Sequence, residues 1–221
     1  MLKATVILPV KRFARAKTRL LGEIGPPGRA LLLRAMLADV LASLEEADEV
    51  ERVILVTGEG RAEKVAMERA KRGRTPIEVL REPTDHGHSE AATLGIVRAK
   101  ALGARCAALL PGDCPLIDPA EVDATLRAME EGRVAVIPDR HGTGTNGLLL
   151  SPCDAIGPAF GEGSCERHMD RAARAGWTAA LAEVDSLALD LDTPEDLAAM
   201  RSLLAAEPGL APLTAAAMAE L

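Results

Sequence analysis

Residues 106–116 read Cys-Ala-Ala-Leu-Leu-Pro-Gly-Asp-Cys-Pro-Leu, and this stretch decides the fold class. The first five residues are apolar and predict a buried strand, because short aliphatic runs that end at a turn signal are typical of sheets covered on both faces. Pro111 and Gly112 end the strand, and Asp113 follows them. An acidic side chain therefore lies at the carboxyl end of a buried strand, where open α/β sheets bind their ligands.

Strand signals recur on both sides of this segment and alternate with helical patterns. The predicted strands cover residues 4–9, 52–57, 76–80, 106–110, 134–138, 145–150 and 187–191. The predicted helices cover residues 28–46, 62–71, 90–102, 119–131 and 165–175, and a further helix begins after Thr193. This alternation predicts an α/β protein of Rossmann-like type, with a mixed, mostly parallel sheet and helices on both faces.

Two helix starts carry capping signals. Asp118 is placed to cap the helix that begins at Pro119, with Glu121 three residues further on, as in a capping box. Thr193 is placed to cap the later helix, which has proline at its first position and two acids in its first turn.

Length and composition indicate a single domain. The chain has 221 residues, of which 48% are hydrophobic, 27% charged and only 1% aromatic, so leucine, valine, isoleucine and alanine must build the core. We expect one domain over residues 1–204. The Ala-rich segment 205–221, which prolines interrupt, is expected to form a peripheral helix or a partly ordered tail.

The charge distribution favours a small anionic ligand over a nucleic acid. The net charge is −7, whereas proteins that bind nucleic acid usually carry a basic face. Positive charge is nevertheless concentrated near the N-terminus, and five basic residues fall within nine positions: Lys11, Arg12, Arg15, Lys17 and Arg19.

The sequence shows no clear signal peptide, membrane span or cysteine motif. The apolar run near the N-terminus is too short for a signal peptide, and no run approaches the length of a membrane span. The four cysteines form no Cys-x-x-Cys pair, which argues against a zinc ribbon or a thioredoxin motif. We expect free thiols and a cytoplasmic location, with no membrane partner.

Three acidic residues are candidate metal ligands. Asp113 suits Mg²⁺, which prefers hard oxygen ligands and often takes only one or two protein carboxylates. In the predicted strand 187–191 and its end, Asp190 and Asp192 would share a face, since side chains alternate along a strand. The alternative is structural, because Asp113 could cap a turn and the second acidic segment could serve only the helix start at Thr193.

The basic loop after the first strand is a candidate phosphate site. It contains neither the dinucleotide-binding glycine pattern nor a P-loop, so lysine and arginine side chains would contact phosphate directly. A solvated basic helix face is the alternative.

Two further segments, residues 139–146 and 160–168, are rich in glycine, serine and threonine, which lets backbone amides and hydroxyls approach an anion. His168 lies one helical turn past Ser164. A single histidine of this kind is more often a structural hydrogen-bonding residue than a catalyst, and the Gly-x-Ser-x-Gly pattern of hydrolases is absent.

Taken together, five motifs resemble one family. They are PVKRFARAKTRL, LLPGDCPLI, DRHGTGTNGLLLSP, FGEGSCERH and DLDTPEDL, and they span roughly residues 4–200. The pattern resembles the guanylyltransferases of coenzyme F420 biosynthesis, which act on 2-phospho-L-lactate or phosphoenolpyruvate.

The resemblance implies a nucleotide-diphospho-sugar transferase fold and a Mg²⁺-dependent reaction of GTP with a phosphorylated C3 acid. The implied metal ligands are Asp113 and one of Asp190 and Asp192, with Asp192 favoured. The implied catalytic residues are Lys17, Asp113 and Asp192. The implied nucleotide contacts are Lys11, Lys17, Arg19, Gly87, Ser89 and Asp113. The implied acceptor contacts are Thr145, Asn146, Gly161, Gly163 and Ser164.

One segment departs from the family. Where relatives commonly carry Gly-Leu-Asn-Ala-Ala, residues 87–91 read Gly-His-Ser-Glu-Ala, in a region that lies near the base in related folds. The departure leaves guanine specificity open and makes His88 and Ser89 candidates for a changed contact.

Several alternatives remain open at this stage. The acceptor could be 3-phosphoglycerate, the enzyme could be a cytidylyltransferase of the same fold, and the protein could be a non-catalytic nucleotide-binding regulator. A monomer and a homodimer are both compatible with the sequence.

Overall fold

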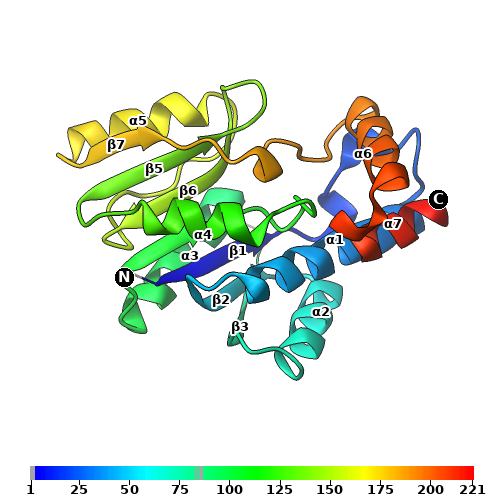
Figure 1. Cartoon of the computed structure of the whole chain (residues 1–221), viewed down its shortest axis with the longest axis horizontal. Helices are drawn as coiled ribbons and strands as arrows, with labels where there is room; N and C mark the ends of the chain where they lie inside the picture. The colour runs from blue at the N-terminus through cyan, green and yellow to red at the C-terminus, as the bar shows by residue number, and fades with distance from the viewer. Residues whose placement is uncertain (1–2, 83, 85–86) are drawn as a thin grey trace.

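A seven-stranded sheet forms the centre of the structure, a computed structural model that describes residues 3–82, 84 and 87–221 (Figure 1). The strand order in the described residues is β3-β2-β1-β4-β6-β5-β7. The strands are β1 (Ala4–Val10), β2 (Val50–Thr57), β3 (Ile77–Arg81), β4 (Cys106–Leu109), β5 (Arg133–Pro138), β6 (Thr145–Ser151) and β7 (Thr178–Leu181). Strand β6 runs antiparallel to β4 and β5, and the other neighbouring pairs are parallel. The predicted mixed, mostly parallel sheet is confirmed.

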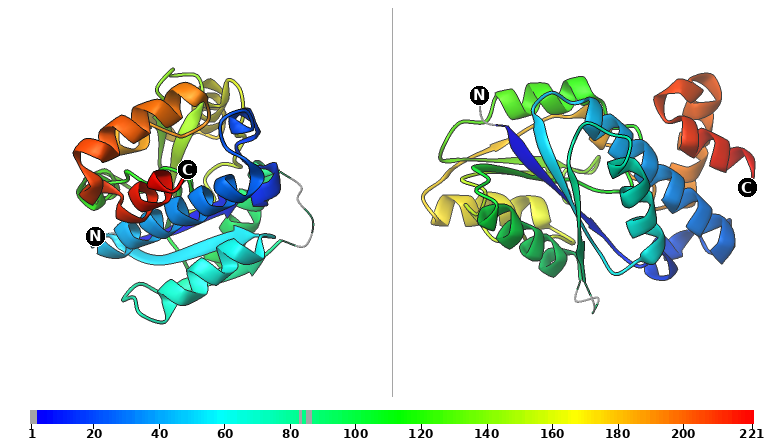
Figure 2. Two further views of the ribbon diagram at one scale, coloured as in Figure 1. Left: turned by 90° about the vertical axis from the view of Figure 1, so that its right-hand side faces the viewer. Right: turned by 90° about the horizontal axis from the view of Figure 1, so that it is seen from below.

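Helices cover both faces of the sheet (Figure 2). On one face, α1 (Pro26–Glu46), α2 (Gly60–Ala70) and α4 (Pro119–Arg127) contribute to one apolar cluster. On the other face, α3 (His88–Ala101) and α5 (Ser164–Arg174) contribute to a second. Within the described ranges, none of the helices combines the length and the apolar character that crossing a lipid bilayer requires.

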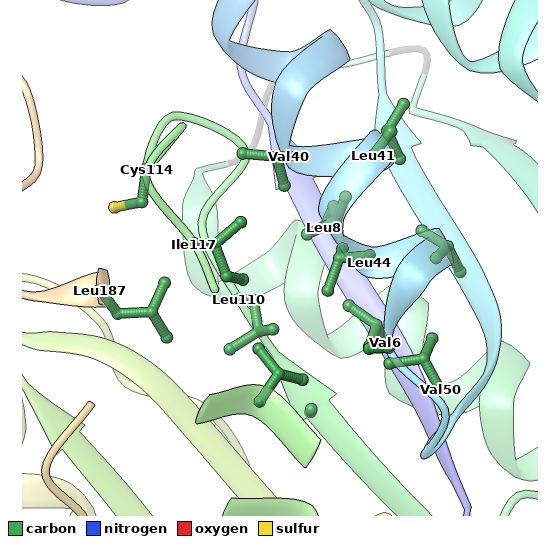
Figure 3. Close-up of a cluster of buried hydrophobic side chains, with 14 of the residues drawn as sticks. Val6, Leu8, Val40, Leu41, Leu44, Val50, Leu110, Cys114, Ile117 and Leu187 are labelled. Atoms are coloured by element: carbon green, nitrogen blue, oxygen red, sulfur yellow. The ribbon is translucent and has the colours of Figure 1, made fainter. Parts of the chain in front are cut away.

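Strand β1 shows how the aliphatic sequence builds this layered core. Val6 and Leu8 face α1, where they join Leu41 and Leu44 in a buried cluster (Figure 3). Ile7 belongs to the cluster on the opposite face. Successive side chains of a strand point to opposite faces, so a strand buried on both sides needs the continuous apolar run that the sequence has here.

The predicted strand over residues 187–191 is wrong. Residues 185–187 form the 3-10 helix η3 (Asp185–Leu187), and the chain then runs without regular structure to Thr193. The last strand is instead β7, at the sheet edge beside β5, which the sequence did not indicate. Its four residues leave little room for a periodic signal, and none of them is fully buried.

The prediction for helix α4 needs correction at its end and at its cap. Helix α4 stops at Arg127, short of the predicted end at residue 131, and Gly132 (φ 81°) then turns the chain into β5. The Asp118 side chain does cap α4, accepting a hydrogen bond from the Ala120 amide at 2.8 Å. Glu121 does not complete a capping box, because it accepts a hydrogen bond from the Ser186 amide at 2.9 Å.

The C-terminal helices pack on α1. Helix α7 (Pro212–Ala219) lies against α1, and α6 (Pro194–Ala206) and the 3-10 helix η4 (Pro208–Leu210) lie against α7 (Figure 2). A third apolar cluster joins them to α1 and to the loop after β1. Its buried members are Leu20, Ile24, Leu32, Met36, Leu191, Leu197, Met200, Leu204, Ala211 and Met218.

Asp39 fixes α7 from outside that helix. Asp39 is only 4% exposed, and its carboxylate accepts hydrogen bonds from the Leu213 amide (3.2 Å), the Thr214 amide (2.7 Å) and the Thr214 hydroxyl (2.7 Å). These amides belong to the first turn of α7, where backbone donors have no partner within the helix. Asp39 therefore acts as an N-terminal cap supplied by α1.

We expect Asp39→Ala to lower the free energy of unfolding by about 1–3 kcal/mol, because buried donors of α7 lose their acceptor. Urea denaturation measures this change. The control is Glu46→Ala, an exposed residue of the same helix, which should change stability by less than about 0.5 kcal/mol. Equal stabilities for the two variants would contradict the capping role.

Candidate active site

A cavity of about 920 Å³ opens at one edge of the sheet. It is lined by residues from the carboxyl ends of β1 and β4 and from the first residues of β6. Because β6 is antiparallel to β4, its beginning lies at the edge where β4 ends. The sheet topology therefore brings Asp113, just past β4, and Thr145, at the start of β6, into one cavity.

Lys17 lies between two carboxylates in this cavity. Its Nζ atom is 2.5 Å from Oδ2 of Asp113 and 2.7 Å from Oδ1 of Asp192. The Lys17 side chain is 6% exposed, whereas those of Asp113 and Asp192 are 33% and 49% exposed. The structure thus brings together the three residues that the sequence analysis named as catalytic.

The charges of this group stabilise one another. Burial disfavours the charged form of Lys17, but Asp113 and Asp192 together raise its pKa above the ordinary value. Burial also opposes ionisation of Asp113, yet the neighbouring Lys17 ammonium holds the pKa of Asp113 below its usual range. We infer that the Lys17 ammonium and the Asp113 carboxylate are ionised together at neutral pH.

Lys17 adopts an unusual backbone conformation. Its φ of 53° and ψ of 40° lie in the left-handed region, and it is the only non-glycine residue with positive φ in the described part of the chain. Such conformations cost about 1–3 kcal/mol and persist where the surroundings enforce them, often at functional sites. The 3-10 helices on either side, η1 (Phe13–Arg15) and η2 (Thr18–Leu20), confine Lys17 to this turn.

The acidic segment reaches the cavity without forming a strand. Asp190 and Asp192 both line the cavity, while Leu191 between them is fully buried in the C-terminal apolar cluster. The burial of Leu191 therefore turns the two acids to the same side. Burial, followed by the like charge of Asp192, raises the pKa of Asp190.

Asp196 holds this segment in place. One of its oxygens, Oδ2, accepts hydrogen bonds from the Asp192 amide (3.0 Å), the Thr193 amide (2.7 Å) and the Thr193 hydroxyl (2.8 Å). The Thr193 hydroxyl accepts one in return from the Asp196 amide, which completes a capping box at the start of α6. The predicted cap at Thr193 is confirmed.

The other oxygen of Asp196, Oδ1, forms an ion pair with Nη1 of Arg140. Asp196 is 1% exposed, so this guanidinium offsets the cost of burying its charge. Burial would raise the pKa of Asp196, but the bonds from Thr193 and Asp192 and the charge of Arg140 lower it. Arg140 belongs to the glycine- and threonine-rich loop, so the ion pair joins that loop to the acidic segment.

Three further basic residues of the predicted phosphate loop line the same cavity, namely Lys11, Arg15 and Arg19, whereas Arg12 does not. Lys11 and Arg19 are exposed within it. The loop is anchored at two points: the Phe13 amide donates to Oε2 of Glu59 at 3.0 Å, and Nη1 of the buried Arg29 donates to the Ala16 carbonyl at 2.7 Å.

Position 112 has no room for a side chain larger than that of glycine. A Cβ atom at this position would lie 2.8 Å from Cγ2 of Val10 and 3.3 Å from Cδ1 of Leu37. The sequence assigned Gly112 to a backbone turn, and the structure adds that β1 and α1 approach it too closely for a side chain. A larger residue would require Val10, Leu37 or the backbone at position 112 to shift.

Four of the five predicted acceptor residues line the same cavity. Thr145, Asn146, Gly161 and Ser164 line the cavity, whereas Gly163 does not and serves as the left-handed N-cap (φ 66°) of α5. The Ser164 hydroxyl is 1% exposed and has no hydrogen-bond partner among the described residues. The side-chain amide of Asn146 (Nδ2) donates a hydrogen bond to the Leu187 carbonyl at 2.8 Å, which connects β6 with η3.

The departing segment 87–91 also reaches the cavity. Gly87 is the N-cap of α3 (φ 112°) and does not line the cavity, whereas His88 and Ser89 do. Ser89 Oγ accepts a hydrogen bond from the Phe160 amide at 3.0 Å, and the His88 ring packs edge-on against the Phe160 ring. Burial lowers the pKa of His88 to about 4.

The sequence did not reveal two supporting residues, Arg140 and Arg29. No local pattern marks either residue, because its importance depends on a partner distant in the chain: Asp196 for Arg140 and the Ala16 carbonyl for Arg29. Only the capping motif around Thr193 could have indicated that Asp196 is buried and needs a counter-charge.

We expect Arg140→Gln to lower the free energy of unfolding by roughly 1–3 kcal/mol, because the buried Asp196 loses its counter-charge. Urea denaturation measures the change. The pKa of Asp196 lies below the ordinary value of 3.8, so the pair stabilises the fold above that pH. The difference between wild type and variant should therefore narrow as the pH falls below 3.8.

The matched control is Arg174→Gln, which removes an exposed pair with Asp170 (3.4 Å) on the surface of α5. Exposed pairs of this kind contribute at most about 0.5 kcal/mol. An Arg140→Gln variant as stable as this control would show that Asp196 does not depend on Arg140.

Known proteins that are similar to this chain in sequence are named guanylyltransferases. The chain is 44% identical over 205 residues to phosphoenolpyruvate guanylyltransferase of Conexibacter woesei, which covers 92% of this chain and 89% of the relative. It is 37% identical over 197 residues to 3-phospho-D-glycerate guanylyltransferase of Phenylobacterium zucineum, covering 87% of each.

A solved structure with the same fold comes from Desulfovibrio desulfuricans and is described as a nucleotide-diphospho-sugar transferase. It superimposes with a TM-score of 0.71 at 19% identity and covers 100% of this chain and 95% of that chain. The expected nucleotide-diphospho-sugar transferase fold is confirmed. Residues 4–202 match the family described as guanylyl transferase CofC like. With a buried lysine between two cavity carboxylates and relatives that are named guanylyltransferases, the chain is an enzyme that belongs to this CofC-like guanylyltransferase family.

Proposed function

We propose that the protein joins the GMP moiety of GTP to a small phosphorylated C3 acid and releases pyrophosphate, as a step of coenzyme F420 biosynthesis. The observation that carries the proposal is the cavity itself. The cavity is lined by Lys17, which lies between Asp113 and Asp192, and also by Ser164, whose hydroxyl is buried without a partner in the described residues. Such a cavity offers separate places for a nucleotide phosphate chain and for a second anion.

Phosphoenolpyruvate is the first acceptor to test, and 2-phospho-L-lactate is the second acceptor that the proposal includes. The Conexibacter relative and a Sphaerobacter thermophilus relative, 38% identical over 191 residues, are both named for phosphoenolpyruvate. The Phenylobacterium relative supports 3-phosphoglycerate as an alternative acceptor.

Mg²⁺ is the metal that we propose for this site, and the donor set fits it. Two carboxylate oxygens, on Asp113 and Asp192, lie within 2.7 Å of one cationic atom, and Asp190 lines the same cavity. No group of three histidine, cysteine or acidic side chains in the described ranges is tight enough to hold an ion by itself. Mg²⁺ commonly binds through one or two carboxylates together with substrate phosphates, and here it would supply neutralisation of the α-phosphate.

The protein's own residues then position two polyanions. In the proposed reaction an oxygen of the acceptor phosphate attacks the α-phosphorus of GTP, the new P–O bond forms, and pyrophosphate leaves with the electrons of the broken bond. Lys17 and Arg19 neutralise charge on the departing pyrophosphate, and Lys11 contributes positive charge to the same cavity. The Thr145 and Ser164 hydroxyls hold the acceptor.

No general base is required for this chemistry. The acceptor phosphate is already ionised at neutral pH and is a competent nucleophile. This agrees with the state of His88 in the cavity and of His168 behind it, because burial lowers the pKa of both histidines to about 4. Holding the reactants in line and balancing their charge are therefore the main contributions of the protein.

The substrate panel tests the function directly. Protein, Mg²⁺ and GTP are mixed with phosphoenolpyruvate, 2-phospho-L-lactate or 3-phosphoglycerate, and pyrophosphate release and product mass are measured. We expect release with at least one acid and its loss when EDTA replaces Mg²⁺. Replacing GTP with CTP or ATP tests base selection, which His88 and Ser89 could alter. GTP binding without release for any acid would refute the transferase assignment.

We expect Asp113→Asn to lower kcat/KM by about 100-fold or more, because a carboxylate that balances Lys17 and binds the metal is lost. Pyrophosphate release measures the loss. The control is Asp154→Asn, which removes an exposed acid paired with Lys100 outside the cavity and should retain activity. Near wild-type turnover by Asp113→Asn with Mg²⁺ would refute the metal assignment.

A further inference from the structure

His168 lies behind the proposed acceptor residues and makes two hydrogen bonds. It is a residue of α5, its exposed fraction is 0%, and it contacts two segments that border the cavity. Its Nε2 atom is 2.8 Å from the Ala159 amide nitrogen, and its Nδ1 atom is 3.0 Å from Oγ1 of Thr145. Thr145 lines the cavity, whereas His168 does not.

The first bond decides which ring nitrogen carries the hydrogen. A backbone amide can only donate, so Nε2 of His168 must be the acceptor in its bond with Ala159. A neutral imidazole has one hydrogen, which must then be on Nδ1. The ring therefore donates to Oγ1 of Thr145, and the threonine oxygen is the acceptor of that bond.

His168 keeps this form over the physiological pH range. Burial, followed by the positive charges of Arg171 and Arg167 on the same helix, lowers its pKa to about 4. Protonation would also require Nε2 to give up the bond from Ala159, because an imidazolium has no acceptor.

The consequence concerns the hydrogen of the Thr145 hydroxyl. Because Oγ1 already accepts a hydrogen bond from His168, the hydroxyl hydrogen is directed away from the ring and is available as a donor. Thr145 is half-buried at the start of β6 and faces the cavity. A ligand that presents only acceptor oxygens, such as an ionised phosphate or carboxylate, matches this hydroxyl.

We propose that His168 is a positioning residue that fixes the Thr145 hydroxyl as a hydrogen-bond donor to an anionic group of the acceptor acid. This inference rests on the proposed function, since it assigns the anion to the acceptor. His168 does not touch the ligand and acts through Thr145.

The same ring also supports the neighbouring loop. The ring accepts a hydrogen bond from the Ala159 amide and makes an edge-on contact with the Phe160 ring (centroid distance 5.3 Å). Both contacts hold the segment that precedes Gly161 in place. A purely structural histidine would act through this loop alone. The proposal instead requires the bond to Thr145, so the two bonds must be separated experimentally.

Two substitutions separate them. The amide nitrogen of asparagine in His168→Asn takes a position like that of Nδ1 and can still donate to Thr145. The amide of glutamine in His168→Gln reaches the position of Nε2, so its oxygen can still accept from Ala159 while the donor to Thr145 is lost. We expect His168→Gln to raise KM for phosphoenolpyruvate by about tenfold, because Thr145 is then no longer held as a donor and its hydrogen bond to the charged acid is weakened.

The expected pattern is specific to the acceptor. KM for GTP and kcat should change less than KM for the acid, because the lost interaction holds the bound acid. His168→Asn should raise KM for the acid less than His168→Gln does, even if thermal unfolding shows that His168→Asn is the less stable variant. Arg174→Gln, an exposed change on the same helix, is the control and should leave both KM values unchanged.

A double-mutant cycle with Thr145 gives a second test. Thr145→Val removes the hydroxyl and should raise KM for the acid as His168→Gln does, while Thr145→Ser should recover most of the loss. If His168 acts through Thr145, the double variant Thr145→Val/His168→Gln should be no worse than the more impaired single variant. Additive losses in the cycle would overturn the proposal.

Calorimetric binding of phosphoenolpyruvate to the intact protein distinguishes failure of this inference from failure of the proposed function. A wild-type KM and Kd for His168→Gln would overturn the inference and leave the function intact. If the wild type binds the acid without releasing pyrophosphate from GTP, the function is refuted, and a weakened Kd in His168→Gln still supports the inference. If the wild type neither binds nor converts any acid of the panel, both are overturned.

Discussion

The ammonium of Lys17 between the carboxylates of Asp113 and Asp192 is the interaction on which the site depends. Two carboxylates this close would repel each other without a cation between them. The three residues come from the loop after β1, the loop after β4 and the segment before α6. Their attraction therefore joins segments that are distant in the sequence at the carboxyl ends of β1 and β4. The left-handed backbone of Lys17 is the conformational cost of this arrangement.

Apolar packing supports this charged group from behind. Leu20, which follows the lysine turn, and Leu191, between the two acids, are both fully buried in the cluster formed with α6 and α7. The cluster therefore holds the loop and the acidic segment against each other from the side opposite the cavity. In this view the C-terminal helices, which Asp39 fastens to α1, contribute to the site by positioning the residues that carry its charge.

The proposed acceptor residues are positioned by strand direction and by hydrogen bonds. Reversal of β6 brings Thr145 to the edge where β4 ends, and His168 of α5 then connects Thr145 with the loop before Gly161. The Arg140–Asp196 ion pair links this part of the site to the acidic segment. Buried polar contacts thus connect the two proposed anion sites, and such contacts are directional and tolerate little displacement.

The sequence by itself determined six of the seven strands, the helix starts at Asp118 and Thr193, and the position of Asp113, because these depend on periodicity and capping among near neighbours. It also named Lys17, Asp113 and Asp192 together, through the family motifs. Only the tertiary structure decided that residues 187–191 form no strand, and that Lys17 turns left-handed to reach a carboxylate 175 residues away. It likewise fixed the tautomer of His168. The physical reason is that burial and charge pairing between distant residues override local preference, and no local pattern records them.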